Sequence, residues 1–264
     1  MRIATLLVVL FLVLVPRAAH ADPKPKPAYQ LRLEMDLSLA LLGGAVTSGF
    51  LVLDEASGVT CATRCDRSKI NFLDRPAAGL YSEEWNKVGN IAVVGTVAFP
   101  AMMLFLEEGL SNGLNDSVVV VEGALMTSAL QVLTSYAVGR PRPRVYGSEA
   151  PLEERTDANA ARSFFSGHMA DTLVVSVGVM QTFMRLGRPK LAWLVLGLGG
   201  AGSAFVGATR VLAGSHFPTD VIAGAAIGVG FGLALPALHD TPVRLAPLAL
   251  PGGGSGLSLV GALP

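Results

Sequence analysis

The segment GATRVLAGSHFPTDV at residues 207–221 places three polar residues, Arg210, His216 and Asp220, between two uncharged apolar runs. Such groups are costly at a membrane boundary, so their presence there indicates a function. Pro218 suits the first turn of a helix. We therefore expect the Asp220 carboxylate to accept a hydrogen bond from one ring nitrogen of His216. That bond would fix the tautomer and make the other nitrogen a better nucleophile.

A second polar segment, SFFSGH at residues 163–168, precedes another apolar run. If a helix begins near His168, its free backbone N–H groups and its dipole favour an anion. Ser166 adds a hydroxyl donor, and Gly167 allows a ligand to approach the backbone closely. His168 can hold the proton that a leaving alkoxide needs. This segment therefore predicts an anion site with a general acid.

The third segment, SYAVGRPRP at residues 135–143, contributes Arg140 and Arg142, each followed by a proline. Like Arg210, they carry a planar guanidinium that binds phosphate oxygens in pairs. The three segments together predict phosphoryl transfer through a phosphohistidine, with charge met by arginine and N–H donors. The motifs include no carboxylate cluster for magnesium, so we expect no metal and no cofactor.

Composition indicates that membrane helices position these segments. The chain is 51% hydrophobic and 15% charged, whereas soluble domains are about one-quarter charged. A span needs about 20 apolar residues, and five runs approach that length: 88–106, 117–139, 172–184, 191–209 and 221–238. The sequence thus predicts an all-α membrane-embedded bundle of about five or six spans, since a soluble fold would need more amphipathic helices. The formal net charge of zero argues against nucleic acid as a partner.

The N-terminal residues 1–21 read as a signal peptide. Arg2 precedes an apolar stretch at 3–15, and the alanines at 19 and 21 form an A-x-A site, which predicts cleavage before Asp22. An uncleaved anchor is the alternative. Residues 22–35 form a Pro/Lys-rich spacer, and the bundle is expected over 36–238.

A Pro/Gly-rich tail occupies 239–264, where the pieces at 244–250 and 256–263 suggest a short hairpin. The two cysteines, Cys61 and Cys65, suit a local disulfide if the chain is exported, although two free thiols are the alternative. Two thiols alone make a poor metal site.

Charged loops predict the orientation. The loop at 185–190 carries three positive charges and is expected in the cytoplasm. Residues 140–166 and 210–220 then lie outside, so the site would face the periplasm from a bacterial inner membrane. A cleaved signal leaves the mature N-terminus outside as well. These expectations agree only if a sixth apolar run, 37–53, does not cross.

These three segments resemble the signature of the type 2 phosphatidic acid phosphatase (PAP2) superfamily: K-x6-R-P, P-S-G-H and S-R-x5-H-x3-D. The resemblance covers roughly residues 88–238 and implies a helical bundle that hydrolyses or transfers phosphate esters without a metal. For membrane members it implies a phosphorylated lipid as substrate and membrane lipids as surroundings. It also implies roles: His216 as nucleophile, Asp220 as its orienting partner, His168 as general acid, and Arg142, Arg210, Ser166 and Gly167 as phosphate binders.

The sequence departs from this signature at three positions. Ser135 stands where the family has lysine, Phe165 where it has proline, and Thr209 where it has serine. Two explanations stay open for the missing lysine: Arg140 substitutes for it, or a charged substrate headgroup is handled differently. Two further functions stay open: a phosphotransferase with the same intermediate, and a catalytically weakened lipid-phosphate-binding membrane protein.

Overall fold

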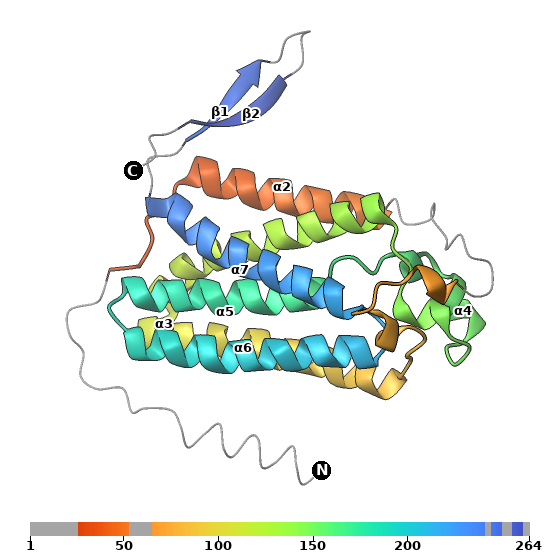
Figure 1. The fold of residues 1–264 in the computed structure, drawn as a ribbon. Helices are drawn as coiled ribbons and strands as arrows, with labels where there is room; N and C mark the ends of the chain where they lie inside the picture. The colour runs from red at the N-terminus through yellow and green to blue at the C-terminus, as the bar shows by residue number, and fades with distance from the viewer. Residues whose placement is uncertain (1–25, 53–64, 241–243, 250–254, 261–264) are drawn as a thin grey trace.

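Long helices lying side by side make up most of this computed structural model, which describes residues 26–52, 65–240, 244–249 and 255–260 (Figure 1). The long helices are α2 (Leu33–Val52), α3 (Glu83–Val138), α5 (Gly167–Arg185), α6 (Pro189–Leu212) and α7 (Pro218–Asp240). Shorter helical turns lie in the connections: Arg67–Lys69, Arg75–Ala77, Pro143–Tyr146, α4 (Leu152–Thr156) and Ala158–Ala161. The expected signal peptide at 1–21 lies outside the described residues.

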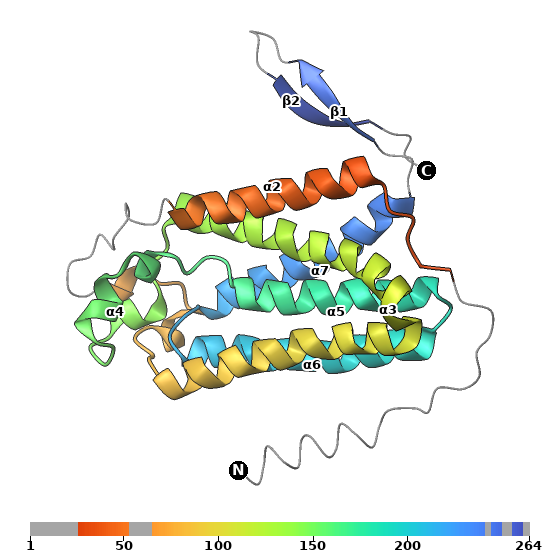
Figure 2. The ribbon, with the colours of Figure 1, turned by 180° about the vertical axis from the view of Figure 1, so that it is seen from behind.

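Helix α3 consists of two halves that meet at Gly109. The backbone there has φ 72° and ψ −178°, which is not helical and which glycine adopts at little cost. The first half runs along α6, and the second half turns back between α2 and α5 (Figures 1 and 2). The expected spans at 88–106 and 117–139 are therefore the two arms of one reversal.

Residues at the helix ends explain where the helices begin and stop. Ser82 caps α3 by accepting a hydrogen bond from the Trp85 N–H, and Gly139 ends it in the left-handed conformation with φ 57°. Pro218 occupies the first position of α7, as the sequence predicted. These ends gather at one end of the bundle, where the three polar segments lie.

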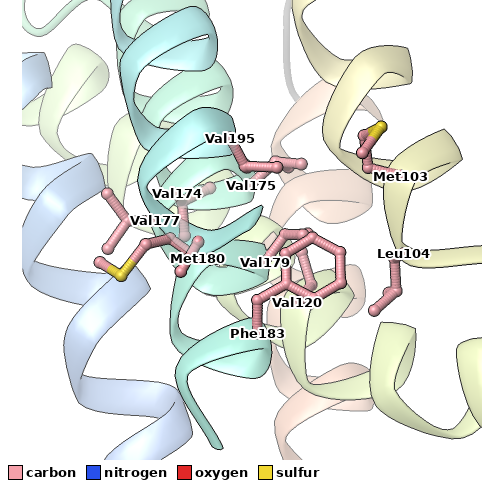
Figure 3. Packing of buried hydrophobic residues seen from close by; sticks show 11 residues of the cluster. Met103, Leu104, Val120, Val174, Val175, Val177, Val179, Met180, Phe183 and Val195 are labelled. Atoms are coloured by element: carbon pink, nitrogen blue, oxygen red, sulfur yellow. The ribbon is translucent and has the colours of Figure 1, made fainter. Parts of the chain in front are cut away.

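Helix α5 is the centre of the bundle and packs against α3, α6 and α7. Its valines and Phe183 form a core with residues from α3 and α6 (Figure 3). Helix α7 lies directly on the α5 backbone: a Cβ at Gly228 would stand 2.4 Å from the Ala170 carbonyl oxygen. Small residues permit such close helix packing in lipid, and it holds the starts of α5 and α7 together.

The membrane character of the bundle is confirmed. Among the described residues, three helical segments are long and apolar enough to cross a membrane: Glu83–Tyr146, Pro189–Leu212 and Pro218–Asp240. The first of them contains the reversal at Gly109 and therefore supplies two arms.

The expectation that 37–53 does not cross stays a prediction, because α2 is not among the three candidate spans found in the described residues. Helix α2 runs along the bundle beside the second half of α3 (Figures 1 and 2). A Cβ at Gly43 would lie 2.9 Å from the Leu125 Cβ. Near its start Asp36 contacts His239 at the end of α7, so α2 begins at the end of the bundle opposite the three polar segments.

This path has a topological consequence. Residues 22–32 are too few to cross a membrane, because a span needs about 20 residues. A signal cleaved before Asp22 and a site facing the periplasm therefore exclude each other when α2 crosses.

Outside the bundle, β1 (Arg244–Ala249) and β2 (Ser255–Val260) pair antiparallel, which confirms the predicted hairpin. Cys65 is buried and disulfide-bonded. Cys61 lies outside the described residues, so the Cys61–Cys65 pairing stays a prediction.

Candidate active site

The three polar segments border one cavity of about 620 Å³ at the end of the bundle that carries α4 (Figure 1). Its lining is strongly polar. The cationic and imidazole groups among the lining residues are Arg142, Arg144, Arg162, His168, Arg210 and His216. The sequence prediction that His168 and His216 share a site is consistent with this arrangement.

His216 lies in the loop between α6 and α7 and is 4% exposed. Its Nδ1 is 2.6 Å from the backbone carbonyl oxygen of Ser163, so Nδ1–H donates this bond. The other nitrogen, Nε2, is left with its lone pair. Burial lowers the pKa of His216 well below its usual value, and the nearby Arg142 charge lowers it further. The ring is therefore neutral at pH 7, as a nucleophile must be.

The predicted hydrogen bond between His216 and Asp220 is not formed. The Asp220 carboxylate instead accepts from the Ser163 hydroxyl at 2.5 Å and from the Phe217 N–H at 2.8 Å. It bonds the backbone at the start of its own helix, as polar residues often do there. Asp220 therefore acts on His216 through Ser163, whose side chain it holds and whose carbonyl orients the ring.

Arg140 does not replace the missing lysine, because it does not line the cavity. Its guanidinium pairs with Asp220 and, at 2.6 Å, with the buried Asp74. Asp74 also accepts from the Thr219 hydroxyl at 2.6 Å and the Thr219 N–H at 3.0 Å. Burial alone would raise the pKa of Asp74, but the bonds from Thr219 and Arg140 hold it below its usual value. Arg140 and the two carboxylates form a clamp behind the site.

Helix α3 fixes Arg210 from the opposite side of the cavity. The guanidinium donates to the Asn86 carbonyl at 2.7 Å and to the Asn90 side-chain oxygen at 3.1 Å. Gly89 lies between these two residues, where a Cβ would be 2.1 Å from Nη2 of Arg210. The sequence signal for this contact is two asparagines one turn apart at the start of an apolar helix.

Several buried donors at the site have no acceptor among the described residues. They are Nε of Arg142, Nε of Arg210 and the hydroxyl of Ser166. Buried polar groups in native proteins are almost always hydrogen-bonded, so such a set calls for a ligand. Donors that converge without an acceptor favour an anion.

The start of α5 adds backbone donors to this set. Gly167 and His168 are its first two residues and line the cavity. The first N–H groups of a helix have no partner within that helix. The Ser166 N–H donates to the Asp220 carbonyl oxygen at 3.0 Å, which ties this helix start to that of α7.

Arg162 is a lining residue that sequence reasoning missed. Its guanidinium lies 4.0 Å from the centre of the Tyr136 ring, and the residue is 8% exposed. Ser135, at the family's lysine position, is buried and donates its hydroxyl to the Val132 carbonyl. The position of the missing lysine thus carries no charge, but a cation lies over the ring of the next residue. The available signal was an arginine directly before SFFSGH.

Comparison with known proteins agrees with the three motifs. The family model described as PAP2 superfamily matches residues 117–244. The matched region contains all three polar segments, which lie at one end of a mostly helical membrane bundle.

Among solved structures, one similar chain is described as the first transmembrane PAP2 type phosphatidylglycerolphosphate phosphatase from Bacillus subtilis. The two chains share 20% identity with a TM-score of 0.45, and the match covers 76% of this chain and 96% of that one. A search of curated proteins gives no match.

Proposed function

We propose that the protein is a phosphatase that removes phosphate from a lipid phosphate or diphosphate through a phosphohistidine, without a metal. One observation carries the proposal: two histidines and several arginines line one cavity in which buried donors lack acceptors in the described part of the chain. The match of residues 117–244 to the PAP2 superfamily model supports phosphate-ester chemistry, and the apolar helices around the site support a lipid substrate.

In the proposed first step, Nε2 of His216 attacks phosphorus and the bond to the ester oxygen breaks. Protonated His168 gives its proton to the leaving alkoxide, so the lipid alcohol departs. Burial and the charges of Arg210 and Arg142 lower the pKa of His168 to about 4, and the negative charge of a phosphate bound beside these groups would raise it again. Arg142 and Arg210 meet the charge on the equatorial oxygens. In the second step, water attacks the phosphohistidine and gives its proton to His168, which releases phosphate and restores both rings.

Arg162 supplies the charge that Ser135 lacks in this proposal. It takes the role that the sequence suggested for Arg140, because the Arg140 guanidinium is ion-paired with Asp74 and Asp220. This substitution argues for an active enzyme over a weakened binding protein.

The test is a panel of lipid phosphates offered to purified protein in detergent with EDTA: phosphatidate, phosphatidylglycerophosphate, an isoprenyl diphosphate and a lipid A phosphate. We expect turnover by the wild type and its loss in His216→Ala and His168→Ala, with ³²P trapped on protein only when His216 is present. Full turnover by His216→Ala would rule out the mechanism. Transfer of phosphate to an added sugar or lipid alcohol would identify a phosphotransferase instead.

We further propose that the site faces the periplasm of a bacterial inner membrane, because Arg32 and the positive loop at 185–190 lie at the opposite end of the bundle. A fluorescent protein that matures only in the cytoplasm, fused after Asp240, is then expected to fluoresce. No fluorescence from this fusion, together with activity of a periplasmic reporter fused at the same position, would reverse the orientation. It would also favour cleavage of residues 1–21.

A further inference from the structure

A second cluster of ionisable groups lies at the end of the bundle opposite the cavity. Asp36 of α2, Glu122 of α3 and His239 of α7 each offer a ligand atom, and these atoms all lie within 4.8 Å of one another. His239 is 19 residues beyond Asp220 on the same helix, roughly 30 Å along its axis. The cluster is therefore separate from the proposed active site.

The ring of His239 is oriented as in a metal ligand. Its Nδ1 lies 2.9 Å from the Leu235 carbonyl oxygen, which fixes the proton on Nδ1. The lone pair of Nε2 then faces two carboxylates, with Asp36 Oδ1 at 3.2 Å and Glu122 Oε2 at 3.7 Å. Histidines that bind metals commonly donate their other N–H to a backbone carbonyl in this way.

Glu122 gives the second, independent indication of a ligand. The residue is 1% exposed, and neither of its carboxylate oxygens has a hydrogen-bond partner among the described residues. A buried carboxylate in that condition is costly unless a cation compensates it. Asp36 is held in place from behind, because its other oxygen accepts from the Arg32 N–H at 2.7 Å.

The spacing suits a small divalent ion. Ligand atoms about 2.1 Å from a metal are roughly 3.0 Å apart at right angles and about 3.4 Å apart in a tetrahedron. The separations of 3.2 and 3.7 Å from Nε2 of His239 are close to these values, and the Asp36 and Glu122 oxygens lie within 4.8 Å of each other. One imidazole with two carboxylates suits Zn²⁺ better than Ca²⁺ or Mg²⁺, which prefer oxygen ligands alone.

We propose that Asp36, Glu122 and His239 bind one Zn²⁺ ion that ties α2 to α3 and α7. The site is structural: three helices distant in sequence each supply one ligand. It does not depend on the proposed phosphatase chemistry, because the metal would lie at the other end of the bundle.

The test uses the full chain, without a histidine tag, purified in detergent and stripped with EDTA. Titration with Zn²⁺ by calorimetry should show one site, and saturation should raise the melting temperature by about 5–10 °C. Glu122→Gln and His239→Gln should each weaken zinc binding by about 100-fold or more and abolish that shift. Glu108→Gln is the matched control, since Glu108 is another carboxylate with partnerless oxygens outside the three-residue cluster.

Wild-type protein alone gives a further readout that does not depend on how the variants fold. Co²⁺ in place of Zn²⁺ should show visible absorption bands of a nitrogen–oxygen site, and Zn²⁺ should displace it. The proposal would be overturned by equal zinc affinity in wild type and Glu122→Gln, or by a wild-type melting temperature that zinc does not change. Either result would mean that a proton on His239, and not a metal ion, compensates the buried carboxylate. Lipid phosphate turnover of the stripped enzyme at low temperature is expected to persist, which separates this result from a failure of the phosphatase mechanism.

Discussion

The two ends of the bundle differ in their buried polar groups: within the part of the chain that the structure describes, one end has hydrogen-bond donors without acceptors, and the other has acceptors without donors. At the cavity end the groups without partners among the described residues are donors: Nε of Arg142, Nε of Arg210 and the Ser166 hydroxyl. At the far end they are acceptors, the carboxylate oxygens of Glu108 and Glu122. One end is thus prepared for an anion and the other for a cation.

Helix direction explains part of this difference. The starts of α5 and α7 meet at the cavity, where N–H groups and the positive ends of the helix dipoles favour negative charge. Both helices end at the far side, where carbonyl groups favour positive charge. Gly167 and His168 lie at such a helix start, and His239 lies in the last turn of α7, where the carbonyl groups are.

The largest effect is expected from Asp220→Ala, which removes the centre of the clamp behind the cavity. It leaves the Ser163 hydroxyl and the Phe217 N–H without this acceptor, and it leaves the Arg140 guanidinium with Asp74 as its remaining carboxylate. Breaking a buried pair costs about 3–5 kcal/mol, and activity should fall with it because Ser163 orients His216. Thermal unfolding in detergent measures the first effect, and turnover of a lipid phosphate measures the second.

Asp240→Ala is the control at the other end of α7. Its carboxylate pairs with Arg185 but is 60% exposed, so about 0–1 kcal/mol is expected. If Asp220→Ala melts no lower than Asp240→Ala, the clamp does not stabilise the site.

Arg142→Ala should affect activity and leave stability nearly unchanged. Its Nε has no protein partner to lose among the described residues, whereas an anion would lose one strong donor. Removing such a donor typically costs about 10²–10³-fold in rate. Arg140→Ala makes the converse comparison: it should lower the melting temperature first, because its partners are Asp74 and Asp220. Equal losses of stability in the two variants would contradict the division between binder and clamp.

Some features of the fold could be predicted from the sequence, and others could not. The spacing of His216, Asp220 and Pro218 predicted the start of α7 and the gathering of three motifs at one end, because helix ends and motif order are local properties. Apolar run length predicted the bundle for the same reason. The runs at 88–106 and 117–139 were expected as two spans joined by a loop, and the structure instead carries helix through most of that loop, with the break at Gly109.

The partners within the site were less predictable. Spacing allowed Asp220 to reach His216, but Ser163 comes between them from a loop more than fifty residues away in the sequence. The sequence suggested Arg140 as a phosphate binder, but in the structure it pairs with the buried Asp74 from another distant loop. Long-range contacts decide which arginine is free to bind, and no local pattern records them.

Arg162→Ala is expected to lower kcat/KM by about 10-fold, because one cation among several is lost from the lining. The sharper measurement is rescue. Ser135→Lys in that background restores the family's lysine beside Tyr136, over whose ring Arg162 lies. Recovery of most of the loss would support the exchange of one cation for the other. A lysine that helps the wild type as much as the variant would show that the two positions act independently.

The smallest effect is a pH dependence of stability that sets the cavity apart from the far end. In the folded protein the pKa of His216 lies well below its usual value because of burial and the charges of Arg142, His168 and Arg210. Below about pH 6.5 the His216 ring binds a proton in the unfolded chain but not in the folded protein. The free energy of unfolding therefore decreases as the pH is lowered, by up to about 1.4 kcal/mol per pH unit. His216→Gln lacks this dependence, so its melting temperature should fall less than that of the wild type between pH 7 and pH 5. His239→Gln shares the wild-type His216 and should retain its contribution to the slope. Parallel curves for wild type and His216→Gln would mean that the ring is protonated in the fold, and a protonated ring would be no nucleophile.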